Sequence, residues 1–510
     1  MKKFLSTKLL IATFTILFIS KASADVTTQD VWNKLRSFIT SSEFELTATE
    51  TQTHGVLKIN ELFFSRTLPN KNFGQGLQLS LSFSSLRFTQ NSDGTVTILL
   101  PKQVIINVHS ESASDKELFL EVKYTHTKPE ITVSGTPDEP VYNYTAEKSQ
   151  LELGKLKLNG IDLLHFGLFA HADIKKININ SAAIKSTPFN FMQTLTIEKV
   201  VYFAGMPMKN SSMDLGGEIL EFRGSNNMTL PFIKKLESST SLLTAGANFK
   251  TNWEHSGKKF NFSSNETGKD GKIKRQSSGG AGELKLNQEF LKLFLESTET
   301  DLSLSHDDLP FPVTLELKKL TTNISFPLDS NMKAKPFSLG VGLSDFTMSE
   351  VLWSIFDENS VLPRRPISLI FDTYGKTKIL FNDLKSAAWG DLKTKGTFPV
   401  EVEKMTLQNF YLSGAGIAVN GHGIFEFGKS DLLKFKGKSL PIGWLEINFQ
   451  GGNTLIDRLT KINLIPKAQS LGIKMMLSML TVPGGLDDEL KARLEVTKDG
   501  HILANGQRIR

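Results

Sequence analysis

Histidine spacing often reveals a metal or acid–base site, and in this chain it indicates neither. The chain has nine histidines. His165 and His171 are six residues apart, which fits neither the i, i+4 pairing of a helical metal site nor two alternate residues on one strand. His422 lies between Gly421 and Gly423, where we expect a turn. We interpret these side chains as ordinary surface or turn histidines and expect no metal site.

Adjacent acids and clustered glycines are the other features that could do chemistry. Asp307-Asp308 and Asp487-Asp488 could form a ligand pair or a catalytic pair, but each lies near Pro or Gly, where solvated loop acids are common. A dinucleotide-binding loop needs a strand, a turn and a helix. The glycine cluster instead lies between two strand patterns, so we expect its members to relieve crowding at bulges and turns; they are Gly414, Gly416, Gly421 and Gly423.

Recognised catalytic motifs are missing from the sequence. Gly-x-Ser-x-Gly, Ser-x-x-Lys with its partner motifs, a phosphate-binding loop and His-Glu-x-x-His do not occur. The chain has no cysteine, which excludes disulfides, thiolate metal sites and a cysteine nucleophile. We therefore expect no catalytic residue and no cofactor, and a protein that is not an enzyme.

Aromatic and methionine usage is the compositional hint about a ligand. Phe occurs 36 times, against 6 Tyr and 5 Trp. Tyr and Trp prevail on surfaces that recognise sugars or proteins, whereas Phe with Leu suits a large apolar interior or an apolar groove. Met475, Met476 and Met479 could form a soft lid that contacts an apolar ligand. The alternative is that they pack a C-terminal helix on a sheet.

Alternating apolar and polar residues dominate the chain and predict antiparallel strands with one buried and one solvated face. Examples begin at Leu77, Leu118, Val313, Phe337 and Leu445, with hairpin signals such as Asn159-Gly160 and Asp499-Gly500 between such runs. In three runs the alternation slips by one residue, as between Leu317 and Leu320, which predicts bulged, strongly curved strands. We expect a mainly β fold of long curved antiparallel sheets.

A few covering helices are expected near the N-terminus and within residues 349–480. Thr27 or Thr28 can cap a helix that contains Val31, Trp32 and Leu35. The later candidates and the terminal hairpin are given by their ranges: Ser349 to Phe356, Asn453 to Ile462, Pro466 to Pro483, and Leu490–Val496 with Ile502–Ile509.

The first 24 residues have the pattern of a cleaved signal peptide. Lysines precede an apolar run from Leu9 to Ile19, and Ala22-Ser23-Ala24 provides small residues for cleavage before Asp25. The run is too short to cross a bilayer, and we expect no transmembrane segment in the mature chain. Export together with the lack of cysteine favours a bacterial periplasm. Without the four lysines of this segment, 55 basic residues remain against 53 acidic ones, so we expect no nucleic-acid partner.

Composition suggests two parts of the mature chain. Residues 255–282 are rich in Gly, Ser and Lys and predict a linker or a long loop. They separate an N-terminal β-rich region, 25–254, from a C-terminal β-rich region with helices and a terminal hairpin, 283–510. Whether the segment divides two domains or tips a long hairpin stays open at this point.

Several blocks together resemble an alphaproteobacterial group known as domain of unknown function 2125. The blocks are residues 25–32, 91–98, 134–144, 352–357, 361–364, 451–457 and 503–508. The resemblance implies an exported, β-rich envelope protein. More loosely, the strand ending in residues 421–427, followed by Gly452 and a Leu-rich helix, is similar to AsmA-type envelope proteins. That likeness implies long curved sheets with an apolar inner face and a link to lipid movement.

We therefore expect an exported, non-enzymatic periplasmic protein that binds or transfers lipid or another apolar ligand. The alternative is an envelope scaffold or assembly factor whose partner is a protein. A third class is a hydrolase with an unfamiliar site, for which no nucleophile, base and orienting residue can be named.

Overall fold

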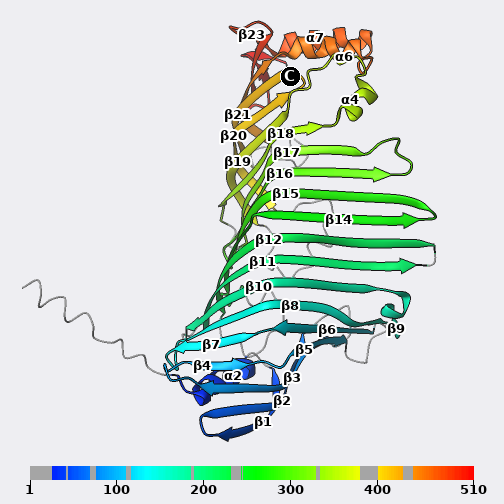
Figure 1. Ribbon diagram of the computed structural model, residues 1–510. Coiled ribbons are helices and arrows are strands. Elements are labelled where there is room, and N and C mark those ends of the chain that lie inside the picture. The colour runs from blue at the N-terminus through cyan, green and yellow to red at the C-terminus, as the bar shows by residue number, and fades with distance from the viewer. Residues whose placement is uncertain are drawn as a thin grey trace, which may run out of the picture. The chain divides into compact units, whose positions relative to one another are not determined.

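The computed structural model describes residues 26–41, 44–68, 76–110, 117–184, 189–208, 210–230, 243, 245–328, 333–379, 400–428 and 440–509. Most of these residues form strands of one antiparallel sheet of 26 strands (Figure 1). The mainly β class with a few helices, predicted from the alternating pattern, is confirmed. The proposed signal peptide, with the cleavage site at Ala24 and Asp25, lies outside the described residues.

Contacts divide the chain into two compact units. Unit 1 comprises residues 1–162 and 175–194, and unit 2 comprises residues 163–174 and 195–510. Unit 1 contains α2 (Thr28–Ser41), β1 (Glu45–Thr53), β2 (Val56–Leu68), β3 (Leu77–Gln90), β4 (Val96–Leu99), β5 (Gln103–Ser110), β6 (Leu118–Thr127), β7 (Glu130–Gly135), β8 (Pro140–Leu158) and β9 (Ile161–Asp162). Strands β10 (Phe169–Ile184) and β11 (Phe189–Met208) have residues in both units.

Unit 2 contains the longest run of neighbouring strands. Its elements are η2 (Leu163–Phe166), β12 (Ser211–Leu230), β13 (Asn248–His255), β14 (Gly257–Glu266), β15 (Lys269–Leu286), β16 (Phe290–His306), β17 (Val313–Pro327), β18 (Lys335–Met348), α4 (Glu350–Phe356), β19 (Ile367–Ile379), β20 (Val400–Gly414), β21 (Ile417–Gly428), β22 (Leu440–Gln450), α6 (Gly452–Lys461), α7 (Lys467–Leu480), β23 (Val482–Pro483), β24 (Glu489–Val496), β25 (Ile502–Ala504) and β26 (Gln507–Arg508).

Unit 1 has a closed hydrophobic core built around α2. Trp32 is fully buried and meets Phe88 of β3 edge to face, with 6.1 Å between ring centroids. Ile59 of β2 and Val133 of β7 belong to the same core and are also fully buried. Thr27 caps the helix, because the backbone amide of Asp30 donates to the Thr27 hydroxyl at 3.1 Å. The N-terminal helix predicted from its apolar spacing is confirmed.

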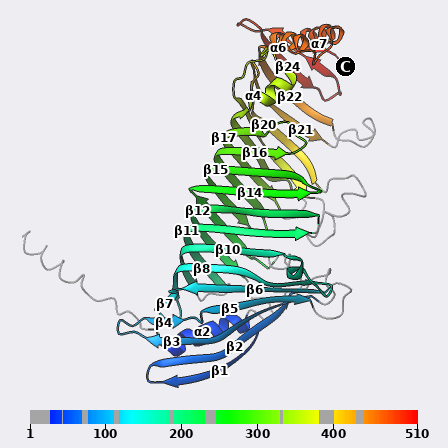
Figure 2. The ribbon, with the colours of Figure 1, turned by 45° about the vertical axis from the view of Figure 1, so that its right-hand side comes forward.

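Unit 2 is a single layer of antiparallel strands, in which β15 to β22 pair in chain order (Figures 1 and 2). At its start, β12 pairs with β14 along residues 211–220 and with β13 along residues 223–229. β15 pairs with the same two strands in turn. The short strands β13 and β14 thus lie end to end between the long strands β12 and β15.

Residues 255–282 form neither a linker nor a long loop, and of the two possibilities left open the long hairpin is nearer to the structure. These residues form the end of β13 and the β14–β15 hairpin. Two of their glycines lie where a side chain would collide with a ring on the neighbouring strand β13. A Cβ at Gly282 would lie 2.1 Å from the Trp253 ring, and one at Gly280 would lie 2.5 Å from His255 Nε2. The two compact units also divide elsewhere in the chain, around residues 163–194.

The one-residue slips in the alternation mark places where strands bend. In β8 the slip is a bulge at Gly154, because Val122 pairs with Leu153 while Glu121 pairs with Lys155. In β15–β18 neighbouring strands skip the same position together, so their pairing keeps its register. Two of the skipped residues, Glu299 and Asp345, have positive φ angles of 43° and 52°. The apolar residues on both sides of the bend therefore stay on one face.

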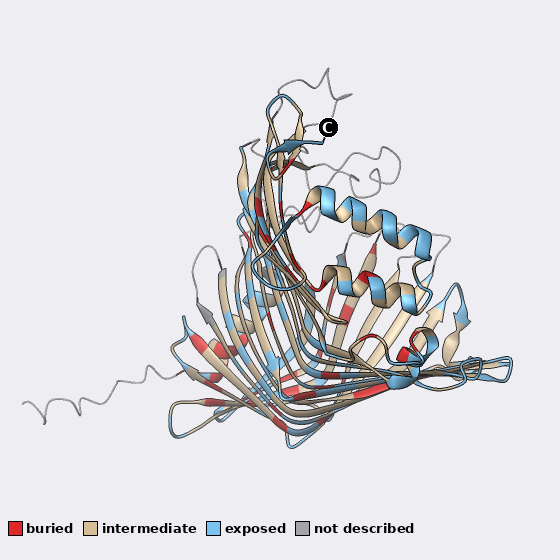
Figure 3. Cartoon of the chain, turned by 90° about the horizontal axis from the view of Figure 1, so that it is seen from above, coloured by how far each residue is buried: buried red, intermediate tan, exposed pale blue. Residues whose placement is uncertain are grey.

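Helices α4, α6 and α7 occupy the ranges predicted from their apolar spacing. The terminal hairpin forms as β24 and β25, with a short β26 after a second turn. Figure 3 shows α6 and α7 on the concave side of the bent strands of unit 2.

Candidate functional site

A continuous row of apolar residues crosses seven strands of unit 2. Directly paired residues in an antiparallel sheet lie on the same face, so successive pairings trace such a row. The row runs through Leu320, Leu343, Leu369, Leu412, Val419, Phe449 and Leu490 of β17–β22 and β24. With strands about 4.8 Å apart, it is about 29 Å long.

Further rows on this face extend it across β12 and β14–β18. One consists of Leu215, Phe262, Ile273, Leu304 and Val313. Another consists of Leu284, Leu293, Ile324 and Leu339. We call the side of unit 2 that carries these three rows the apolar face.

The opposite side of the same strands is polar. Lys319 of β17 pairs with Glu296 of β16, with 2.9 Å between Nζ and Oε2. Lys318 lies 3.7 Å from a carboxylate oxygen of Asp345, and the Thr347 hydroxyl donates to Glu316 at 3.4 Å. The sheet of unit 2 is therefore amphipathic, with charged residues on one side and Leu, Ile and Phe on the other.

The apolar face is only partly covered. No Leu, Ile, Val, Met or Phe among the described side chains of β12–β18 is buried. Leu295 keeps 40% of its surface exposed and Leu339 keeps 36%, whereas Ile59 in the core of unit 1 keeps none. A single sheet cannot bury its own face, because burial needs a second layer. The strands β12–β18 thus present apolar surface that the described residues leave accessible.

Helices α6 and α7 cover one end of this face. A Cβ at Gly452, the first residue of α6, would lie 3.7 Å from both Leu477 of α7 and Leu490 of the apolar row. Beneath the helices burial is high: Val419 is 6% exposed and Ile456 of α6 is 7% exposed. The covered end and the partly exposed strands belong to one continuous face.

Asp488 holds α6 in place, which corrects its interpretation as a solvated loop acid. Its carboxylate accepts from the backbone amides of Asn453 at 3.1 Å and Thr454 at 2.9 Å, which form the first turn of α6. Burial raises the pKa of Asp488, but these hydrogen bonds outweigh it and hold the pKa below its usual value. Asp307 and Asp308 do lie in an exposed turn, as predicted.

The methionines of α7 do not pack on the sheet. Met475, Met476 and Met479 are 60%, 57% and 69% exposed. Helical geometry puts Met475 and Met479 on the side of α7 opposite Leu477, which faces α6 and the sheet. The core-packing interpretation of these residues is therefore wrong. Their role as a ligand face stays a prediction.

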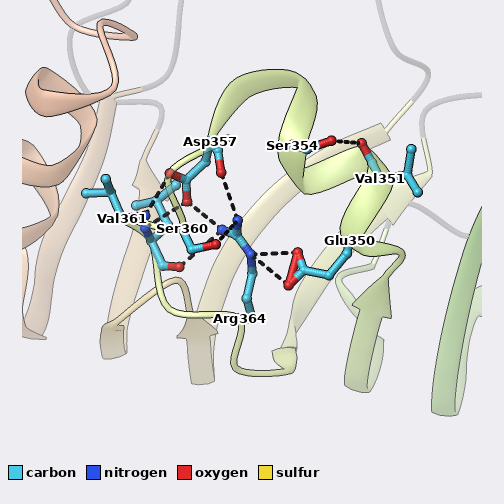
Figure 4. Close-up of polar contacts among 8 residues, drawn as sticks. Glu350, Val351, Ser354, Asp357, Ser360, Val361 and Arg364 are labelled. Carbon is cyan, nitrogen blue, oxygen red and sulfur yellow. Dashed lines mark hydrogen bonds and ion pairs between the residues drawn. The ribbon is translucent and has the colours of Figure 1, made fainter.

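A buried ion pair joins α4 to the loop before β19 (Figure 4). Asp357, at 1% exposure, accepts from the backbone amides of Val361 and Leu362, each at 2.8 Å, and from the Arg364 guanidinium at 2.5 Å. The guanidinium also bonds Glu350 and lies 4.5 Å above the Trp353 ring. Burial raises the pKa of Asp357, but the amide of Leu362 and the Arg364 guanidinium more than offset this and lower it.

This ion pair connects residues 352–357, which include the end of α4, with residues 361–364. The neighbouring cavity, bounded in part by Trp353 and Arg364, has a volume of about 70 Å³. That is the space of about two water molecules, too small for a lipid. We interpret the cluster as a structural clamp.

The polar cluster of unit 1 does not have the geometry of a hydrolase. The Tyr124 and Tyr144 hydroxyls are hydrogen-bonded to each other, and Ser149 Oγ lies 2.9 Å from the Tyr124 hydroxyl. His126 contacts Tyr144 at 3.4 Å and the carbonyl of Pro101 at 2.7 Å, and Ser149 is 3% exposed. A nucleophilic serine needs a base within hydrogen-bond reach and access to substrate. The cluster instead ties β6 and β8 to the loop between β4 and β5.

His422 is in strand β21, not in a turn as expected. Its ring meets Trp444 edge to face at 5.4 Å, and its Nε2 lies 3.4 Å from Glu446. The flanking glycines lie opposite a bulge of β20, between Leu407 and Phe410, which confirms that glycines occur at a bulge here. Within the described ranges, no three His, Asp or Glu side chains are close enough together to hold a metal ion.

Comparison with protein-family models, curated proteins and solved structures found no match. None of the helices formed by the described residues is long and apolar enough to cross a bilayer.

Proposed function

We propose that this protein binds the acyl chains of lipids along the apolar face of unit 2 and transfers them within the cell envelope, without catalysing a reaction. The supporting observation is the unbroken apolar row across seven strands, together with two further rows of partly exposed residues on the same face. The strands of this face that α6 and α7 leave uncovered, β12 and β14–β18, span five strand spacings, about 24 Å. This exceeds a single acyl chain, since the hydrocarbon core of a bilayer, two chains thick, is about 30 Å. A chain could therefore move along this face.

Energetics favour an occupant for this face. Burying a leucine side chain completely is worth about 1.5–3 kcal/mol, so covering the exposed 40% of Leu295 is worth about 1 kcal/mol. An acyl chain that covers several such side chains gains several kcal/mol. The residues of the three rows are aliphatic or Phe, with no Tyr or Trp, which suits a ligand without polar groups along its length.

We place this activity in the periplasm because of the signal-peptide pattern of residues 1–24. Cell fractionation and N-terminal sequencing test this part of the proposal. We expect the mature protein in the periplasmic fraction, beginning at Asp25. A full-length chain in the cytoplasmic fraction would contradict it.

The ligand test is native mass spectrometry of protein purified from the periplasm without detergent, followed by organic extraction. We expect stoichiometric phospholipid or fatty acid. The double variant Leu295→Gln/Leu339→Gln should weaken binding of a fluorescent fatty acid by about thirtyfold, since two sites each lose about 1 kcal/mol. The matched control is Thr314→Gln/Asn323→Gln, two exposed residues on the polar side of β17.

An apo mass together with no uptake of the fatty acid would refute lipid binding. If crosslinking in the envelope then captured a protein whose yield falls in the Leu295→Gln/Leu339→Gln variant alone, the apolar face would serve a scaffold or assembly factor. Equal fatty-acid binding by the two double variants would show that the ligand lies elsewhere.

A further inference from the structure

Helix α7 presents an apolar stripe to solvent. Leu471, Met475 and Met479 follow each other at intervals of four residues and so lie on one side of the helix. They are 65%, 60% and 69% exposed. The side chain of Leu477, on the other side, faces α6 and Leu490. The helix is thus attached to the sheet by one side and exposes apolar residues on the other.

The segments before and after α7 also carry exposed apolar residues. Leu464 is 53% exposed, Val482 44% and Leu486 68%. Scattered exposed leucines are common on soluble proteins, but contiguous apolar patches mark interaction sites. We call Leu464, Leu471, Met475, Met476, Met479, Val482 and Leu486 the α7 patch.

The charges around the α7 patch are mixed, but two of its lysines are unpaired among the described residues. Residues 452–489 contain four basic residues, Arg458, Lys461, Lys467 and Lys474, and four acids, Asp457, Asp487, Asp488 and Glu489. Asp488 is bound to the amides of α6, and Glu489 is 9% exposed. Asp457 is paired with Lys474, with 2.6 Å between Oδ1 and Nζ. Lys461 and Lys467 are exposed and form no ion pair with a described residue. Exposed lysines beside exposed Leu and Met match a partner that is both apolar and anionic.

We propose that α7 docks this protein on the surface of a bilayer that contains anionic phospholipid. A helix with apolar residues on one side and lysines nearby lies in the plane of the membrane, with the apolar side at the boundary of headgroups and acyl chains. The 14 residues of α7 span about 21 Å, too short to cross. Each lysine near an anionic surface adds about tenfold to binding at most, and flexible methionines fit an irregular lipid surface.

This docking is independent of lipid binding along the apolar face, although it would bring the covered end of that face to the membrane. The test is therefore flotation of the full mature chain with vesicles. Flotation measures membrane binding and does not measure lipid uptake. The vesicles are phosphatidylcholine alone, or equimolar phosphatidylethanolamine and phosphatidylglycerol. We expect flotation with the anionic vesicles, much weaker flotation with phosphatidylcholine, and a decrease as salt is raised.

The variant Leu471→Gln/Met475→Gln/Met479→Gln should lose at least about tenfold in anionic vesicle binding. Its matched control changes three exposed aliphatic residues elsewhere, Leu99→Gln/Ile161→Gln/Leu309→Gln, which are 44%, 53% and 43% exposed. The control should float as the unchanged protein does. Lys461→Gln/Lys467→Gln should reduce binding to anionic vesicles only.

Failure of the unchanged protein to float, or equal flotation of the α7 variant, would overturn the proposal. So would a dimer in analytical ultracentrifugation that the α7 substitutions convert to a monomer, because a second copy would then cover the patch. Fatty-acid uptake by the α7 variant is measured separately in solution. If uptake is unchanged while vesicle binding is lost, the loss concerns docking by α7 and not lipid binding along the apolar face.

Discussion

Replacing Asp357 by Asn should destabilise the clamp between α4 and β19 by about 3 kcal/mol. The Asp357 side chain is 0% exposed and accepts from two backbone amides and the Arg364 guanidinium. In Asn, one oxygen becomes an NH2 group that must face one of these donors. Breaking a buried pair by removing one charge typically costs about 3–5 kcal/mol. Because Arg364 keeps 20% exposure, water screens it partly, and we take the lower end.

The assay is urea unfolding, combined with hydrogen exchange of residues 350–364. Since two units need not unfold together, hydrogen exchange reports whether the loss is local. The matched control is Glu350→Gln, which removes the other carboxylate on Arg364. Its side chain is 69% exposed, so its effect should stay below about 1 kcal/mol. A loss below about 1 kcal/mol for Asp357→Asn, or equal losses for both variants, would refute the reasoning.

The pH dependence provides a second readout for the same clamp. The hydrogen bonds hold the pKa of Asp357 below its usual value in the folded protein. The stabilisation is therefore present above the unfolded pKa, about 3.9, and is lost as the pH falls through the lower folded pKa. Unfolding free energy should fall more steeply below about pH 4 in the unchanged protein than in Asp357→Asn. Parallel pH profiles would contradict this.

Four further substitutions have expected outcomes. Trp32→Ala should destabilise unit 1 by about 3–5 kcal/mol in denaturant unfolding, because this side chain is fully buried; a loss below about 1 kcal/mol would contradict the core. Gly282→Ala should cost about 1–3 kcal/mol because its Cβ would meet the Trp253 ring. Its control, Gly472→Ala in α7, has open space around it and should be neutral or stabilise by up to about 1 kcal/mol. A larger loss of stability for Gly472→Ala than for Gly282→Ala would refute the crowding argument. Asp488→Ala should cost about 1 kcal/mol and expose α6 to limited proteolysis, and an unchanged cleavage rate would show that the cap is dispensable.

Local patterns predicted the elements well because their causes are local. Alternation with period two predicts a strand wherever one face is apolar, and it located β3, β6, β17 and β18. The caps and apolar spacing of α2, α4, α6 and α7 also depend on neighbours within a few residues. The bend between Leu317 and Leu320 could also be predicted from the sequence, because the unpaired residue Lys318 shifts the alternation of apolar residues by one position.

The glycine-rich stretch shows where a local signal misleads. Gly280 and Gly282 look like a flexible segment, yet they face His255 and Trp253 on the neighbouring strand. No pattern within the segment distinguishes a mobile glycine from one that makes room for a ring. Asp488 is similar: it caps a helix that begins 36 residues earlier, at Gly452. Both require knowledge of which strands and loops are neighbours.

By itself, the sequence determined that the chain is mainly β, where its helices lie and that its strands are amphipathic, since all three follow from side-chain order along the chain. Only the tertiary structure decided how apolar residues are used. In unit 1 a helix closes over them, so Trp32 is buried; in unit 2 the strands form one layer, so Leu295 and Leu339 stay partly exposed. The methionines of α7 face solvent because no described residue packs over that side of the helix. Burial is a property of which surfaces meet, and the alternation along a strand is identical whether or not a second layer covers it.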